Sequence, residues 1–294
     1  MVSVKSYAKL NISLKVMEKS NGFHMLDSVV CSVDKFDHIT VKKRKDHKIL
    51  VTFTGKYGFT PKIQEETNAY KAAKLIIDNF NLKGVDVTVK RNIPTGSGMG
   101  GSSADIAGVL IAIKKLFKLD CDLKPFADSL GSDAGYMLSG GYARLTGKGE
   151  IIKPIKVDKK YYFVVIYSSS GVNTKDCFNL FDSLNLQNLS IDIDGVEKAL
   201  IDGDLDKIAT LGGNDLTIPA TKLNSEIDNN LNALKSLSPT VCFMTGSGST
   251  CFSMYSEYEL ASWAFNKLKK QYGDRVELLY AIDPSNLTFF DNLF

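Results

Sequence analysis

The segment Ile93-Pro-Thr-Gly-Ser-Gly-Met-Gly-Gly-Ser-Ser-Ala-Asp105 has the composition of a loop that binds an anion. Glycines occupy four of its thirteen positions, and two adjacent serines follow them. Glycines at this density let successive backbone N–H groups converge on a phosphate, and the N-terminus of a following helix adds its positive dipole end. A serine hydroxyl in the first turn of that helix can reach Mg²⁺ or a phosphate oxygen. The segment therefore predicts a phosphate-binding loop that needs no lysine.

Other interpretations of this segment remain open at this point. Gly96-x-Gly98-x-x-Gly101 fits the dinucleotide fingerprint, but it lies about ninety residues into the chain, behind a proline and without the expected βαβ unit. A Walker-type loop is excluded because no lysine follows the glycines. The structural alternative is a tight strand-to-helix turn in which Ser102 or Ser103 caps the helix.

The elements on either side of the segment favour a loop between a strand and a helix. Residues 85–90 alternate as in a strand, and the residues after the serines place apolar side chains on one helical stripe. Further strands are expected at 11–16, 28–33, 39–41, 49–53, 142–145, 162–167, 241–244, 251–255 and 276–282. Further helices are expected at 68–79, 125–130, 193–202, 222–236 and 257–272. Strands and helices interleave in both halves, and we place a domain boundary near residue 155.

The bulk composition excludes several classes of partner. The formal net charge is +3, from 36 basic and 33 acidic residues, which is too small to suggest nucleic acid. The longest apolar run, residues 161–167, is too short to span a membrane, and the N-terminal segment does not resemble a signal peptide. Five scattered cysteines indicate free thiols in a reducing compartment. We therefore expect a cytoplasmic protein.

Three motifs in the chain resemble those of the GHMP small-molecule kinases. Pro94–Asp105 is similar to their central motif, Ala8-Lys-Leu-Asn-Ile-Ser-Leu-Lys15 to the first and Met244-Thr-Gly-Ser-Gly-Ser-Thr250 to the third. The resemblance implies an α+β fold of two domains, each a mixed or antiparallel sheet packed with helices. Residues 1–155 would hold the ATP loop and the catalytic groups, and residues 156–294 a glycine turn that binds substrate.

The resemblance also implies the chemistry of the site, with ATP as phosphoryl donor and Mg²⁺ as cofactor. Asp133 would accept the proton of the attacking hydroxyl, and Lys9 would lie beside it. Ser102 and Ser103 would be the magnesium ligands, although the alignment leaves their register ambiguous. The ATP-binding residues would be Pro94, Thr95, Gly96, Ser97, Gly98, Met99, Gly100, Gly101, Ser102 and Ser103.

Finer features point to one branch of this superfamily. Asn21-Gly-Phe-His24 resembles a stretch in kinases of the non-mevalonate isoprenoid pathway, which phosphorylate the 2-hydroxyl of a methylerythritol linked to cytidine diphosphate. In that reading His24 hydrogen-bonds the polar edge of cytosine, while aromatic side chains cover its faces. The substrate-binding residues would be Asn11, Phe23, His24 and Phe178 at the nucleotide, and Gly246, Ser247 and Gly248 at the diphosphate.

Two alternatives remain within the superfamily. One is a kinase for homoserine, a mevalonate-type compound or a sugar, and the other is an inactive paralogue that only binds a nucleotide. Ala134-Gly135 departs from the apolar residue and proline that usually follow the catalytic aspartate, and we expect a more flexible loop there. We expect a monomer or a weak homodimer.

Overall fold

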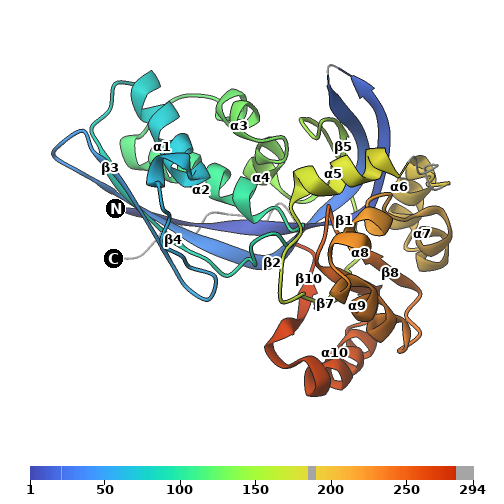
Figure 1. Ribbon diagram of the computed structural model, residues 1–294. Helices are drawn as coiled ribbons and strands as arrows, with labels where there is room; N and C mark the ends of the chain where they lie inside the picture. Colours follow the sequence, from blue (N-terminus) through green and yellow to red (C-terminus); the bar gives the residue numbers. More distant parts are fainter. Residues whose placement is uncertain (21, 185–189, 283–294) are drawn as a thin grey trace.

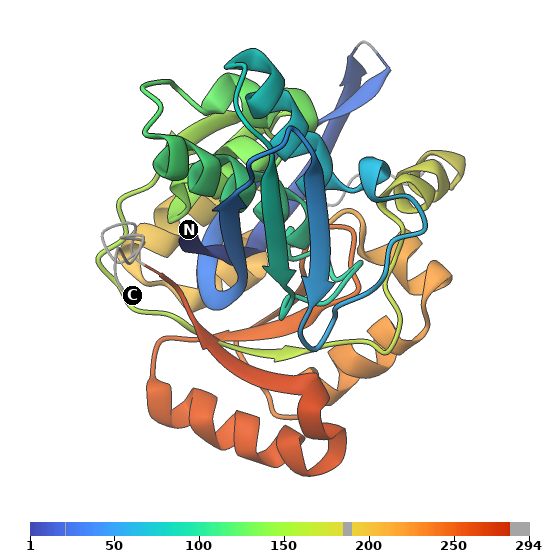
Figure 2. The same cartoon turned by 90° about the vertical axis from the view of Figure 1, so that its left-hand side faces the viewer.

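The computed structural model describes residues 1–20, 22–184 and 190–282, which form two β-sheets with helices packed on them (Figures 1 and 2). The larger sheet has six strands in the order β3-β4-β2-β5-β6, with β1 paired to β2. The smaller sheet has four antiparallel strands in the order β10-β7-β9-β8. This agrees with the predicted α+β class.

A long antiparallel hairpin of β1 (Val2–Ser20) and β2 (Phe23–Lys43) runs through the molecule (Figure 1). The second edge of β2 is divided between two partners: residues 38–43 pair with β4 (Val85–Lys90), and residues 26–31 pair with β5 (Tyr142–Gly147). The sheet is completed by β3 (Ile49–Thr54), parallel to β4, and β6 (Ile151–Pro154), antiparallel to β5. The hairpin tip beyond Leu26 therefore pairs only with itself.

The three segments predicted as strands at 11–16, 28–33 and 39–41 are all strand, but the first is part of the longer β1, and the separation of the other two was wrong because both belong to β2. Buried polar residues outside the predicted segments, among them Lys9, Lys35 and Asp37, interrupt the apolar pattern of these strands. Their side chains have hydrogen-bond partners inside the protein, so the strands continue where hydropathy alone suggests a break.

Four helices pack on one face of the large sheet: α1 (Asn68–Asn79), α2 (Gly101–Phe117), α3 (Lys124–Leu130) and α4 (Ala134–Ser139) (Figure 1). Ten consecutive residues of α2, 104–113, are buried, as expected for a helix enclosed on all sides. The prediction of a serine cap was wrong: Gly100 is the N-cap, in a left-handed conformation, and both serines lie in the first helical turn.

The small sheet consists of β7 (Tyr162–Ile166), β8 (Val241–Met244), β9 (Cys251–Tyr255) and β10 (Val276–Tyr280). Its half of the chain also contains α5 (Thr174–Ser183), α6 (Ile193–Asp202), α7 (Leu205–Leu211), α8 (Thr217–Leu223), α9 (Glu226–Lys235) and α10 (Tyr258–Tyr272). The single helix predicted at 222–236 is interrupted, because Asn224 is extended and its side chain accepts a hydrogen bond from the Glu226 amide. The helices α4, α5 and α7 were not predicted.

The two sheets share one hydrophobic cluster, in which Leu10 and Ile12 of β1 join Phe163 and Phe252 of the small sheet. The chain passes from one sheet to the other between Pro154 and Tyr162. The division into domains 1–155 and 156–294 stays a prediction.

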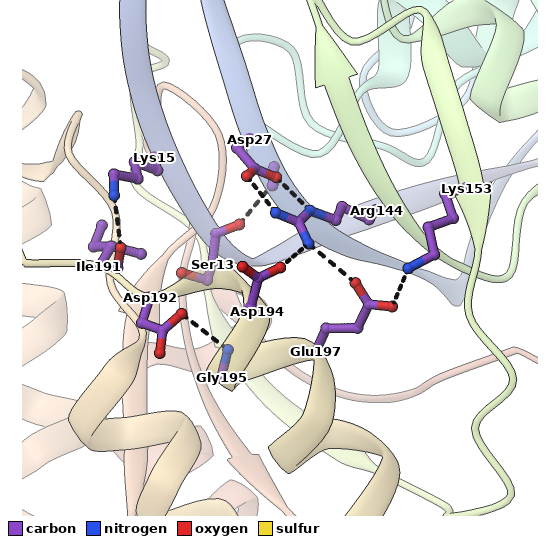
Figure 3. A network of polar contacts seen from close by, with 11 residues as sticks. Ser13, Lys15, Asp27, Arg144, Lys153, Ile191, Asp192, Asp194, Gly195 and Glu197 are labelled. Atoms are coloured by element: carbon purple, nitrogen blue, oxygen red, sulfur yellow. Dashed lines mark hydrogen bonds and ion pairs between the residues drawn. The ribbon is translucent and has the colours of Figure 1, made fainter.

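Ion pairs also join the two halves (Figure 3). Arg144 of β5 contacts Asp27 of β2 through two hydrogen bonds of 2.7 and 2.6 Å, and it also contacts Asp194 and Glu197 of α6. Lys153 of β6 donates to Glu197 at 2.8 Å. These contacts hold α6 against the large sheet.

Candidate active site

A cavity of about 1460 Å³ brings together segments from both halves of the chain. Its walls are the β1–β2 hairpin, the glycine-rich loop (residues 93–103), residues 128–133, the turn at 148–150, α5 and residues 246–247. All predicted site residues line this cavity except two, Met99 and Gly248. The tertiary structure thus gathers the three motifs around one space.

The carbonyl groups of the glycine-rich loop face the rest of the fold. Backbone amides outside the loop donate to several of them: Val172 and Ser249 to Gly96, Thr250 to Ser97, and Lys9 to Met99. By contrast, the amides of Gly98 and Gly100 have no acceptor among the described residues, and the first amides of α2 are left over by helix geometry. The loop therefore offers donors to an anion.

Gly98 shows why this loop needs glycine. Its φ is +75°, and a Cβ placed there would lie 2.1 Å from the Thr245 carbonyl oxygen. A side chain would thus push the loop away from the turn at residues 246–248. Met99 follows with its side chain buried in the shared hydrophobic cluster, so it contributes packing rather than cavity surface.

Lys9 and Asp133 form an ion pair in the cavity wall, with Nζ 3.5 Å from Oδ2. Asp133 occupies the N-cap position of α4 but makes no capping hydrogen bond, so its carboxylate remains directed at Lys9. The Lys9 ammonium also donates to Asn11 Oδ1, and the Asn11 amide group donates to Ser28 Oγ at 2.7 Å. A buried ammonium group and a half-buried carboxylate therefore lie side by side, although β1 and α4, which position them, are far apart in the sequence.

Ala134 and Gly135 form the first turn of α4 rather than a flexible loop. The packing explains the glycine, because a Cβ at Gly135 would lie 2.2 Å from Asp128 Oδ1. That oxygen is buried and has no hydrogen-bond partner among the described residues. In this chain Ala134 and Gly135 stand where an apolar residue and a proline are usual, because the carboxylate of Asp128 on α3 comes close to Gly135 and leaves no room for a side chain.

The aromatic end of the cavity is formed by Phe23, His24 and Phe178. The rings of His24 and Phe178 stack with centroids 5.2 Å apart and an interplanar angle of 23°. Phe23 is 60% exposed and lies beneath the ammonium of Lys148, which is 5.3 Å from the ring centroid. This end presents aromatic surface together with cationic and acidic side chains, as a base-binding pocket requires.

The turn at residues 246–248 packs directly against the glycine-rich loop, because a Cβ at Gly246 would lie 2.7 Å from the Gly98 carbonyl oxygen. Ser247 Oγ is 2.9 Å from Thr174 Oγ1, and Asn214 donates to the Gly246 carbonyl at 2.8 Å. Gly248 faces the other way, because a Cβ there would meet Met244, Ile227 and Ala220. Gly246 and Ser247 are thus available to a ligand, and Gly248 supports the turn from the core side.

Oxygen donors for a metal ion are present beside the loop. Ser102 Oγ already accepts a hydrogen bond from Asn68, whereas Ser103 has no such contact among the described residues and lies near Gly131. Within residues 1–20, 22–184 and 190–282, no cluster of three His, Cys, Asp or Glu side chains could hold a metal alone. Mg²⁺ prefers oxygen ligands and is usually bound together with substrate phosphates, so the Ser103 hydroxyl fits such an ion.

Sequence reasoning missed several residues that line the cavity. Beside the glycine-rich loop lie Tyr57, Phe59 and Arg91; at the aromatic end lie Lys19, Lys148 and Asp182; near Thr174 lies Lys175. Asp182 stands four residues after Phe178 on α5, so recognising that helix would have placed both on one face. Arg91 directly precedes the loop motif, but nothing in its neighbours indicated a site.

The GHMP kinase profiles match both halves of the chain: the N-terminal domain over residues 67–143 and the C-terminal domain over residues 196–274. Together with the fold and with full-length relatives, this shows that the chain belongs to the GHMP kinases, a family of small-molecule kinases. No described helix is long and apolar enough to cross a membrane.

Several relatives along the full chain bear the name of one particular kinase. The chain is 33% identical to a 4-diphosphocytidyl-2-C-methyl-D-erythritol kinase of Clostridium perfringens, over 97% of this chain and 100% of that protein. Identity to the Clostridium beijerinckii enzyme of the same name is 31%, over 93% and 98%. A crystal structure of 4-(cytidine 5'-diphospho)-2C-methyl-D-erythritol kinase superimposes with a TM-score of 0.78 at 26% identity, covering 96% of this chain and all of the other. Homoserine kinase from Cytophaga hutchinsonii, at 19% identity and a TM-score of 0.74 over 96% and 94%, shares the fold.

Proposed function

We propose that this kinase transfers the γ-phosphoryl group of ATP to the 2-hydroxyl of 4-diphosphocytidyl-2-C-methyl-D-erythritol, in isoprenoid precursor synthesis. One observation carries the proposal: a single cavity holds the glycine-rich loop, the Lys9–Asp133 pair and the aromatic end. The full-length relatives that bear this enzyme's name support the choice of substrate.

ATP binds with its phosphates against the glycine-rich loop. The amides of Gly98, Gly100 and the first turn of α2 donate to the phosphate oxygens, and the positive end of the helix dipole favours the anion. Tyr57 and Phe59 line the cavity beside this loop and offer apolar surface to the nucleoside. Ser103 would hold Mg²⁺ together with the ATP phosphates, and the bound ion would supply charge neutralisation on those phosphates.

The acceptor hydroxyl lies next to Asp133. Its proton passes to the carboxylate as the hydroxyl oxygen forms a bond to the γ-phosphorus, and the bond from that phosphorus to ADP breaks. Lys9, 3.5 Å from Asp133, offers a fixed positive charge to the oxygen as negative charge develops on it. Asn11 holds the ammonium in place from the opposite side.

The cytidine diphosphate group of the substrate occupies the aromatic end. Phe23 and Phe178 line this end and offer aromatic surface to cytosine, and the ring of His24 stacks on Phe178. Gly246, Ser247 and Thr174 line the wall where the diphosphate linker passes. Hydrogen bonding of the cytosine edge by His24 stays a prediction, because its Nε2 contacts Asp182 in this structure.

The test is a coupled assay for ADP release with ATP·Mg²⁺ and a panel of alcohols. We expect turnover with the cytidyl-diphosphate substrate and none with homoserine, mevalonate or free sugars. Asp133→Asn should lower kcat by about 10²- to 10⁴-fold, the usual contribution of a general base, with an unchanged Kd for ATP. The matched control is Asp120→Asn, because Asp120 is an exposed acid that follows α2. Turnover of Asp133→Asn at the wild-type rate would refute the assignment of the base.

A further inference from the structure

One carboxylate of α5 joins both strands of the β1–β2 hairpin at its tip. Asp182 Oδ2 lies 2.5 Å from Lys19 Nζ on β1, and Oδ1 lies 2.8 Å from His24 Nε2 on β2. Lys19 and His24 are themselves cross-strand neighbours. All three side chains line the cavity at its aromatic end.

The hairpin tip needs such a contact. Beyond Leu26 the two strands pair only with each other, and a register shift between Val16 and Lys19 interrupts their ladder. A two-stranded ribbon on its own is marginally stable in water. The tip also carries Phe23, so its position decides where one aromatic wall of the cavity stands.

The ring of His24 is held from three sides by α5. Phe178 stacks on one face at 5.2 Å, Phe181 meets the ring edge-on at 5.7 Å, and Asp182 accepts from Nε2. The second ring nitrogen, Nδ1, lies 3.5 Å from the Met17 carbonyl oxygen, at the limit of a hydrogen bond. Because a carboxylate only accepts, Nε2 must carry a hydrogen, which fixes the orientation of the imidazole.

We propose that Asp182 is a positioning residue that determines substrate specificity: it clamps His24 and Lys19 against α5 and so builds the pocket for the base of a nucleoside-diphosphate substrate. The inference rests on the proposed function for the identity of the substrate. It assigns no direct contact between Asp182 and the ligand. The carboxylate acts through the ring of His24 and through the hairpin tip.

The kinetic test compares Asp182→Ala and Asp182→Asn with Asp176→Asn. Asp176 is an exposed acid on the same helix, without a side-chain partner among the described residues. Loss of a charged hydrogen bond should raise KM for the cytidyl-diphosphate substrate about tenfold in Asp182→Ala, while kcat and KM for ATP stay within about twofold. Asp182→Asn, which can still accept from Nε2, should lie in between. An unchanged KM in Asp182→Ala, or an equal rise in KM for ATP, would overturn the inference.

A double-mutant cycle separates positioning from a merely local effect. In a His24→Ala background, the tenfold effect of Asp182→Ala should shrink to about threefold or less, because only the contact with Lys19 remains. Two full, additive effects would show that Asp182 acts independently of His24, against the inference.

Imidazole ¹⁵N NMR supplies a readout that needs no turnover. The chain has three histidines, His24, His38 and His47. Asp182→Ala should change the ring signals of His24 alone, and signals unchanged from wild type would contradict the clamp. Wild-type protein that fails to phosphorylate the cytidyl-diphosphate substrate would instead refute the proposed function and leave the NMR test standing.

Discussion

Arg91 and Asp105 form a buried ion pair directly behind the glycine-rich loop. Arg91 also donates a hydrogen bond to Thr95 Oγ1 at 3.3 Å. Its guanidinium lies 5.1 Å from the ring centroid of Phe53 and 5.2 Å from that of Phe59, within the range of a cation–π contact. One oxygen of Asp105 has no hydrogen-bond partner among the described residues. The side chain of Arg91, which directly follows β4, thus meets Asp105 of α2 under the loop that we assign to ATP.

The burial of Asp105 beside Arg91 predicts that the free energy of unfolding depends on pH. Burial raises the pKa of the Asp105 carboxyl to about 7, although Arg91 lies beside it. In the unfolded chain that pKa is about 4, so between these values the unfolded state releases a proton that the folded state keeps. Asp105 therefore stabilises the fold fully below about pH 4, and this contribution is lost as pH rises towards 7, by up to about 1.4 kcal/mol per pH unit.

The measurement is denaturant unfolding of wild type and Asp105→Asn from pH 4.5 to 8. Because the other titrating groups are common to both proteins, the difference between their free energies of unfolding isolates residue 105. We expect wild type to lose stability relative to the variant as pH rises. A difference that does not change with pH, or that grows in favour of wild type, would contradict the raised pKa.

At the scale of elements, α6 is attached to the large sheet by the side chain of Arg144 (Figure 3). The guanidinium bonds both oxygens of Asp27 on β2 and reaches Asp194 and Glu197 on α6. Arg144 and Asp27 are each 18% exposed, so water screens this pair only in part. Lys153, by contrast, is 67% exposed although it contacts the same Glu197.

Arg144→Met should lower the free energy of unfolding by about 2 kcal/mol, because it keeps the apolar stem but leaves partly buried carboxylates unpaired. Lys153→Met should cost less than about 0.5 kcal/mol, as exposed pairs usually do. Denaturant titration of both variants at one pH provides the comparison. Equal losses would show that burial does not distinguish the two cations.

At the scale of the whole molecule, the two halves share a core and a cavity. Residues of β1 pack against Phe163 and Phe252 of the small sheet, and the backbone N–H of Asn11 donates to Thr245 Oγ1 at 2.8 Å. The same strand carries Lys9. Any separation of the halves would therefore expose apolar surface and dismantle the candidate site at once.

Because of this shared core, we expect a single cooperative unfolding transition for the full chain. Differential scanning calorimetry should give equal calorimetric and van't Hoff enthalpies, and ATP should raise the midpoint of the whole transition. A fragment of residues 1–155 should lack a cooperative transition by circular dichroism, since its core would be incomplete. Two separate transitions would instead support independent domains divided near residue 155.

Much of the fold could be predicted from the sequence where local patterns decide it. The helix at 68–79 and the strands at 85–90, 241–244 and 251–255 have the predicted bounds, because each has a regular apolar pattern and clear ends. The long hairpin and α5 could not be predicted in the same way. Buried Lys9 interrupts the apolar pattern of β1, and α5 opens with the polar residues Thr174, Lys175 and Asp176.

The sequence by itself determined the chemistry available to this protein: a glycine-rich loop ahead of a helix, a lysine, an aspartate, and a histidine that follows a phenylalanine. Glycine spacing and residue type are local properties, so the motifs and the family could be recognised from them. Only the tertiary structure decided that Lys9 stands 3.5 Å from Asp133 and that Asp182 meets His24. Both contacts join residues more than a hundred positions apart, and their distance depends on how sheets and helices pack, which no local pattern encodes.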